Sequence, residues 1–98
     1  MSNDHQTVTL NIREYMDYGL SVFDANDNRI GSVYDYNRDH NYMVVRRDGL
    51  ARRLLYIPYR AITNIDPREV FISISQDDAE RSYSNPPPGE TVLEWREP

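Results

Sequence analysis

The chain has 98 residues, enough for one hydrophobic core, and its 39% hydrophobic and 28% charged composition is typical of a single globular domain. It contains no cysteine, and all eleven of its cationic residues are arginine, which excludes disulfides, zinc–thiolate sites, cysteine nucleophiles and lysine Schiff bases. It has no apolar run long enough to span a membrane and no signal-peptide pattern, so we expect a cytoplasmic protein, with a net charge of −5.

The N-terminal half of the chain predicts a helical turn and then three strands. Asn11 and Glu14 have the spacing of a capping box, so we expect a short helical turn that ends by Asp17. Polar and apolar residues then alternate, and Gly31 within this pattern predicts a bulge or a close backbone contact. The expected strands cover residues 20–23, 30–36 and 42–47, with a turn at 24–29 and a polar loop at 37–41.

A fourth strand at 52–59 is expected to form a hairpin with the third, and two loops compete to join them. A two-residue turn at the Asp-Gly pair 48–49 is a strong hairpin signal, but it sets Val45 opposite Arg52. A four-residue loop sets Val45 opposite Leu54 and keeps apolar residues together on both faces. We therefore predict the four-residue loop, at residues 48–51.

The C-terminal half predicts one more strand, a second helix and a tail. Pro58 is expected to end the fourth strand or to lie at a sheet edge, because proline donates no ladder hydrogen bond. Asp77 and Glu80 have capping-box spacing, which predicts a short helix that ends near Tyr83. The other expected elements are a one-turn helix at 61–64, a turn at 66–69, a strand at 70–75, a stiff proline-rich spacer at 85–89 and an alternating segment at 91–95.

Five or six short strands at hairpin spacing predict an all-β fold, a small β-barrel with short helical turns and an extended C-terminal tail. We divide the chain into an N-terminal segment at 1–17, a barrel domain at 18–84 and a tail at 85–98. The expected core residues are Val22, Ile30, Val33, Ile57, Ile62, Val70, Ile72 and Ile74.

The order of five short segments resembles a known family. The segments are GLSVFD at 19–24, RIGSV at 29–33, LYIP at 55–58, residues 62–66 and residues 70–75. Together they are similar to the pattern of the PRC-barrel, a fold named for the cytoplasmic domain of the photosynthetic reaction centre H subunit. The fold recurs in a ribosome maturation factor and in small stand-alone bacterial and archaeal proteins.

The resemblance implies a compact β-barrel that docks onto a protein partner and carries no catalytic motif. The sequence departs from the family where the usual glycine of the first hairpin turn is replaced by Asn28 or Arg29, and the proline-rich tail lies outside the pattern. The photosynthetic and ribosomal roles therefore do not transfer, because a shared fold alone does not give a function.

The segment DANDNRIGSVYD at 24–35 places oxygen-bearing residues at the spacing of a calcium loop. An EF-hand loop also needs glycine at its sixth position and a bidentate glutamate at its twelfth, where this chain has Arg29 and Asp35. Aspartate and asparagine are also common turn residues, since their side chains bond the nearby backbone. We therefore predict a turn headed by Asp24 and not a metal site.

No other motif indicates catalysis or a cofactor. The two histidines, His5 and His40, lie in polar segments where exposure is expected, and the sequence has no nucleophile elbow, glycine-rich phosphate loop or zinc-protease motif. We expect a protein that is not an enzyme and has no catalytic, cofactor-binding or metal-binding residues.

Four arginines gather around the predicted hairpin loop. In the predicted register Arg46 faces Arg53 and Arg47 faces Arg52, and like charges opposite one another destabilise a sheet. Either the protein's own acids neutralise them, with Asp48, Asp66 and Glu69 as the candidates, or they bind an anion such as an acidic protein surface, an RNA phosphate or a lipid headgroup.

Both faces of this hairpin are apolar near its base, but a barrel buries only one face. Tyr42, Val44, Leu55 and Ile57 are expected on one face, and Met43, Val45, Leu54 and Tyr56 on the other. The second face must be covered by the terminal segments or by another chain, so we expect a homodimer, with residues 91–95 either added to the neighbour or folded back.

These features predict a non-catalytic protein-interaction module, and an RNA- or ribosome-associated protein is the alternative. Aromatic and arginine residues carry much of the binding energy at interfaces, and stacked tyrosines also suit bases. The net charge of −5 disfavours general nucleic-acid binding. The candidate partner-binding residues are Arg46, Arg47, Arg52, Arg53, Tyr56 and Trp95.

Overall fold

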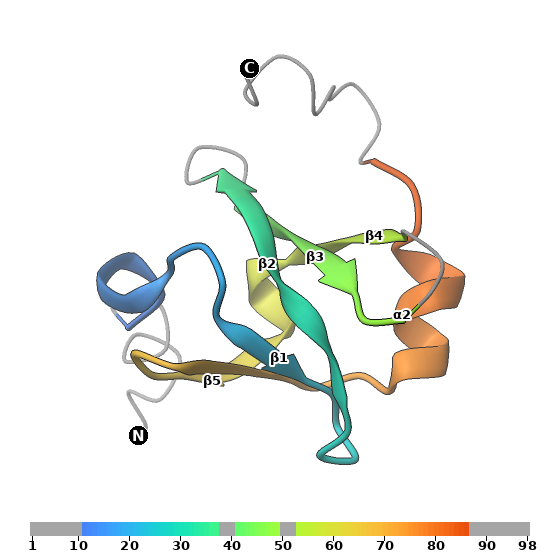
Figure 1. The fold of residues 1–98 in the computed structure, drawn as a ribbon, viewed down its shortest axis with the longest axis horizontal. Coiled ribbons are helices and arrows are strands. Elements are labelled where there is room, and N and C mark those ends of the chain that lie inside the picture. The colour runs from blue at the N-terminus through green and yellow to red at the C-terminus, as the bar shows by residue number, and fades with distance from the viewer. Residues whose placement is uncertain (1–10, 38–40, 50–52, 87–98) are drawn as a thin grey trace.

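The computed structural model describes residues 11–37, 41–49 and 53–86. Six strands form one mixed sheet in the order β4-β3-β2-β1-β6-β5, which curls into a half-barrel (Figure 1). The strands are β1 (Ser21–Phe23), β2 (Arg29–Asn37), β3 (Tyr42–Arg47), β4 (Leu54–Pro58), β5 (Ile62–Ile65) and β6 (Glu69–Ile72). The helices are a helical turn at residues 11–15, the 3₁₀ helix η1 (Tyr59–Ala61) and α2 (Gln76–Ser82).

The curl of the sheet follows from its connections. Strands β1 to β4 form an antiparallel meander, and β4 lies at one edge of the sheet while β5 lies at the other. Only the three residues of η1 join these two edges, and so short a segment spans only about 10 Å. The edges must therefore lie near one another, which bends the sheet around a common core.

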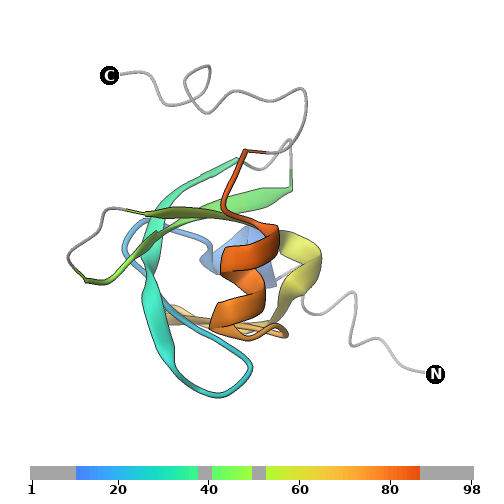
Figure 2. The ribbon, with the colours of Figure 1, turned by 90° about the vertical axis from the view of Figure 1, so that its right-hand side faces the viewer.

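The core fills the inside of this half-barrel. Seven of the eight expected core residues are buried, and the eighth, Ile74, is half-buried and packs against them. Helix α2 lies across one end of the half-barrel (Figure 2) and contributes Ala79, which has no exposed surface. Further buried members of the cluster include Met16, Met43, Val45, Leu55 and Ile65.

Gly31 makes the close backbone contact that the sequence predicts. A Cβ atom at this position would lie 2.1 Å from the carbonyl oxygen of Arg46 on β3, far inside van der Waals contact. Strand β2 is also irregular, because the register with β3 shifts between Val33 and Asp35. These features let the long strand β2 bend and pair with both β1 and β3.

The predicted register of the β3–β4 hairpin is wrong by one residue. Val45 pairs with Leu55 instead of Leu54, Arg46 pairs with Leu54, and the N–H of Arg47 donates to the carbonyl of Arg53 at 2.8 Å. The connection is therefore residues 48–52, and no strand pairing places Arg46 opposite Arg53.

The register correction also reassigns the two faces of the hairpin. The face toward the core carries Met43, Val45, Leu55 and Ile57, all members of the buried cluster. The opposite face, which we call the outer hairpin face, carries Tyr42, Val44, Arg46, Leu54 and Tyr56.

Two local predictions in the second half of the chain are also wrong. The helix expected at 61–64 is a single 3₁₀ turn that ends at Ala61, and Ile62–Ile65 form β5 because their β-branched residues pair with β6. The N-cap of α2 is Ser75, whose hydroxyl accepts from the N–H of Asp78 at 3.1 Å, so Asp77 and Glu80 form no capping box.

Several predictions fall on residues that are not described, including the spacer beyond Pro86, the segment at 91–95 and both histidines. The division into three segments stays a prediction. In the part of the chain that is described, no helix is long and apolar enough to cross a membrane.

Candidate partner-binding surface

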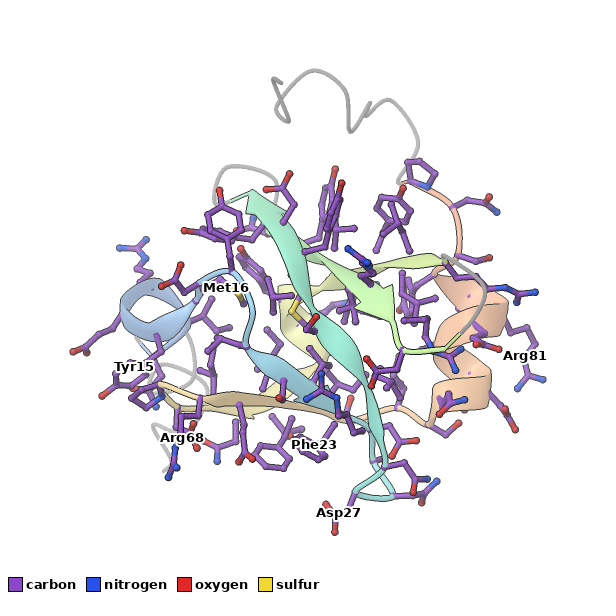
Figure 3. All side chains as sticks on the ribbon, viewed as in Figure 1. Tyr15, Met16, Phe23, Asp27, Arg68 and Arg81 are labelled. Carbon is purple, nitrogen blue, oxygen red and sulfur yellow. The ribbon has the colours of Figure 1, made fainter. Side chains whose placement is uncertain are left out.

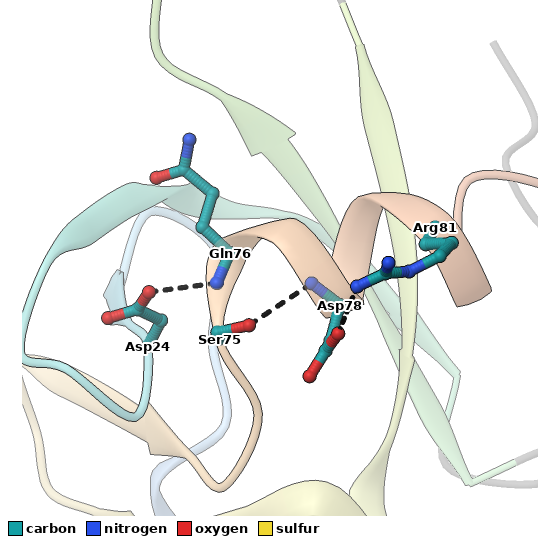
Figure 4. A network of polar contacts seen from close by, with 5 residues as sticks. All are labelled: Asp24, Ser75, Gln76, Asp78 and Arg81. Atoms are coloured by element: carbon teal, nitrogen blue, oxygen red, sulfur yellow. Dashed lines mark hydrogen bonds and ion pairs between the residues drawn. The ribbon is translucent and has the colours of Figure 1, made fainter.

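Asp24 organises the turn between β1 and β2. Its side chain is 2% exposed, and one carboxylate oxygen accepts from the N–H groups of Asn26 and Asn28, each at 2.9 Å. The other oxygen accepts from the N–H of Gln76 at 2.8 Å, so Asp24 ties the turn to the first residue of α2 (Figure 4). This arrangement confirms the prediction that Asp24 heads a turn.

The hydrogen bonds determine the charge state of Asp24. Burial raises the pKa of its carboxyl group, but the backbone N–H groups of Asn28, Gln76 and Asn26 outweigh burial and hold the pKa below its ordinary value. Asp24 is thus a buried, ionised cross-link between two loops. In the described residues, no three histidine, cysteine or acidic side chains gather as a metal site.

Arg47 is held inside the protein. It lies at the end of the core-facing side of β3 and forms an ion pair with Glu80 of α2, with 16% and 30% of the two side chains exposed. Its guanidinium group is therefore committed to fastening α2 across the end of the half-barrel. One of our two interpretations was that the protein's own acids neutralise the arginines, and Glu80 does this for Arg47. Glu80 is not one of the three acids that we named as candidates.

Asp48, the nearest acid in the sequence, pairs with a different arginine. Its carboxylate lies 2.8 Å from Nε of Arg29 on β2, and both side chains are about half exposed. Arg46 and Arg53 are exposed, and neither has an ion-pair partner within the described residues. Arg52 and Trp95 lie outside those residues, so their predicted roles stay predictions.

The outer hairpin face brings Arg46 beside aromatic and aliphatic side chains. Arg46 is directly opposite Leu54, and Tyr56 follows two residues along the same face. The ring of Tyr56 meets the ring of Tyr42 edge-on, with centroids 6.3 Å apart and planes at 65°. Tyr42 and Val44 are buried, while Leu54 and Tyr56 are half-buried.

This packing has a simple chemical consequence. Tyr42 and Val44 are buried at the base of this face, and the exposed Arg46 lies at its rim, directly opposite Leu54 in the register. A cation beside a half-buried tyrosine can bind a carboxylate that has an apolar group next to it, or a phosphate whose base stacks on the ring. The surface is suited to binding, and it holds no nucleophile with an adjacent base.

The comparisons with known proteins give no further lead, because no family model matches the chain and no curated protein matches it.

Proposed function

We propose that this chain is a non-catalytic protein-interaction module of PRC-barrel type that acts as a homodimer in the cytoplasm. The observation that carries the proposal is the exposed Arg46, without an ion-pair partner among the described residues, beside Leu54 and Tyr56 on the outer hairpin face. Exposed arginine flanked by half-buried aromatic and aliphatic side chains is the composition of interface hot spots.

The architecture supports the proposed PRC-barrel assignment. The five strands expected from the sequence are present as β1, β2, β3, β4 and β6, and with β5 they curl into a half-barrel around the expected core residues. The family implies docking onto a protein, which agrees with a binding surface on the outside of the sheet and a filled interior.

Arg46 and Arg53 are the best-supported anchors of the predicted set. Both are exposed and lie at the hairpin end, Arg46 on the outer hairpin face and Arg53 opposite Arg47 on the other face of the hairpin. Arg47 is excluded as a free anchor, because Glu80 already neutralises it. We expect the partner to present carboxylates toward the hairpin end and an apolar side chain toward Leu54 and Tyr56.

Affinity purification from the source organism tests this proposal when it compares three forms of the protein. The Arg46→Glu/Arg53→Glu variant should lose a protein that the wild type retains after nuclease treatment. The matched control, Arg13→Glu/Arg81→Glu, makes the same charge change at exposed positions elsewhere and should keep that protein. A captured protein that the Arg46→Glu/Arg53→Glu variant still binds would count against the hairpin end as the binding surface.

RNA binding is the second candidate, and the half-buried ring of Tyr56 on the same face as Arg46 favours it, because an aromatic side chain can stack on an unpaired base. Titration of a labelled single-stranded RNA separates the two functions. For single-stranded RNA, the logarithm of the binding constant falls with the logarithm of the salt concentration, and each phosphate contact adds about 0.7 to the slope. The affinity of a protein interface depends only weakly on salt. The protein-interaction proposal predicts no saturable RNA binding at physiological salt.

A further inference from the structure

The only two phenylalanines of the chain lie outside the core. Phe23 on β1 and Phe71 on β6 are directly opposite one another in the parallel pair, and their rings stack with centroids 5.3 Å apart and planes at 20°. Their neighbours in sequence, Val22 and Val70, are fully buried. The two half-buried rings therefore point to the outside of the sheet, as Figure 3 shows for Phe23.

A charged row lies beside the rings on the same face. Two residues before each phenylalanine, Ser21 is opposite Glu69. The guanidinium group of Arg29, from the neighbouring strand β2, donates to the hydroxyl of Ser21. The same guanidinium group also pairs with Asp48, so the row carries the Arg29–Asp48 ion pair on the β1 side and the carboxylate of Glu69 on the β6 side. We call Ser21, Arg29 and Glu69, together with Phe23 and Phe71, the phenylalanine face.

The phenylalanine face is complementary to itself. A two-fold axis parallel to the strands, midway between β1 and β6, brings Phe23 of one copy onto Phe71 of the other. The same axis brings Arg29 over the second copy's Glu69. Because of the two-fold symmetry, the ring contact and the charge contact each occur twice in the dimer. A closed two-fold dimer requires one patch that matches itself in this manner.

We propose that a second copy of this chain docks on the phenylalanine face and forms a two-fold symmetric dimer. The inference rests on the homodimer in the proposed function and locates its interface, on β1 and β6 and away from the outer hairpin face. Glu69 has no ion-pair partner among the described residues, and the Arg29 of a second copy would supply one in both halves of the dimer. The face is small, so we expect a dissociation constant of about 10–100 µM.

Sedimentation velocity over a concentration range of about 5–500 µM tests the dimer directly. The wild type should shift from monomer to dimer, and Phe71→Glu should stay monomeric, because it places two carboxylates in the ring contact. Tyr18→Glu, a charge at a 63% exposed tyrosine, is the control and should dimerise as the wild type does. Circular dichroism melts check that each variant is folded.

The results distinguish this inference from the wider proposal. A wild type that stays monomeric overturns both the phenylalanine face and the homodimer, while the partner-binding role of the outer hairpin face stands. A wild type that dimerises together with a folded Phe71→Glu variant overturns the phenylalanine face alone.

A charge exchange tests the arrangement even if Phe71→Glu fails to fold. Arg29→Glu and Glu69→Arg should each weaken the dimer at least tenfold, because each opposes like charges twice. Mixing the two variants should restore a dimer, since both contacts then join opposite charges. Arg81→Glu, on α2, makes the same charge change as Arg29→Glu and should have no effect (Figure 3). A mixture that stays monomeric overturns the arrangement.

Discussion

Replacement of Asp24 by asparagine should destabilise the fold through a single misplaced amide group. The side-chain oxygen of an asparagine can still accept hydrogen bonds from the N–H groups of Asn26 and Asn28. The NH₂ group of that asparagine then faces the N–H of Gln76, so that two donors meet. A buried donor without an acceptor costs about 1–3 kcal/mol, and the two remaining bonds lose their charge assistance. We therefore expect Asp24→Asn to lower the free energy of unfolding by about 3 kcal/mol.

Such a loss is large for a domain of this size. It is a sizeable part of the roughly 5–15 kcal/mol that stabilises a typical domain, and it corresponds to a melting temperature lower by about 12–24 °C. Urea unfolding followed by circular dichroism measures it. Asp27→Asn is the matched control, because Asp27 is exposed in the same turn and its positive φ of 63° suits asparagine. An Asp24→Asn variant within about 0.5 kcal/mol of the wild type would refute the role of Asp24.

The pH dependence of this effect has a definite sign. The pKa of Asp24 is lower in the folded protein than in the unfolded chain, so its stabilising contribution is complete above about pH 4 and is lost as the pH falls through the folded pKa. The difference in unfolding free energy between wild type and Asp24→Asn should therefore narrow below about pH 4. A difference that stays constant between about pH 7 and pH 3 would contradict an ionised Asp24.

Three further predictions concern the sheet and its contact with α2. Gly31→Ala should cost about 3 kcal/mol or more in a thermal melt, because its Cβ would meet the carbonyl oxygen of Arg46 at 2.1 Å. Glu80→Gln should cost about 1–3 kcal/mol in urea unfolding, because it leaves the mostly buried Arg47 without its carboxylate. Cysteines at Arg46 and Leu54 should form a disulfide on mild oxidation, seen by mass spectrometry, whereas a pair shifted by one residue should not.

Alternation of apolar and polar residues predicts most of the strands, but it does not predict their partners. The strand expected at residues 70–75 is present as β6 at Glu69–Ile72, yet nothing in its pattern indicates that β6 pairs with β1 in parallel. That pairing depends on η1, which returns the chain to the far edge of the sheet. Long-range pairing of this kind is a property of the whole fold and not of a local segment.

The hairpin register shows why a local rule can select the wrong alternative. Four consecutive apolar residues begin at Tyr42 in β3, and another four begin at Leu54 in β4. A shift of one residue therefore keeps apolar residues opposite one another and only exchanges the faces. The observed register gives the core four aliphatic side chains and moves both tyrosines to the outer hairpin face.

The candidate site was predictable only in part. Asp24 could be recognised as a turn residue because its hydrogen bonds to the turn are local. The ion pair of Arg47 and Glu80 could not be predicted from the sequence, because it depends on where α2 packs against the sheet. The stacked phenylalanines also have no local signal, since Phe23 and Phe71 become neighbours only through the parallel pairing of their strands.

A photo-crosslinking amino acid at position 56 tests most directly whether the outer hairpin face binds a protein. A benzophenone side chain in place of Tyr56 keeps an aromatic ring there, and the same group in place of the exposed Tyr18 is the control. After irradiation in cells of the source organism, we predict a crosslink from position 56 to one protein other than this chain, and no such crosslink from position 18. Crosslinks to RNA alone, or the same proteins from both positions, would contradict the proposed function.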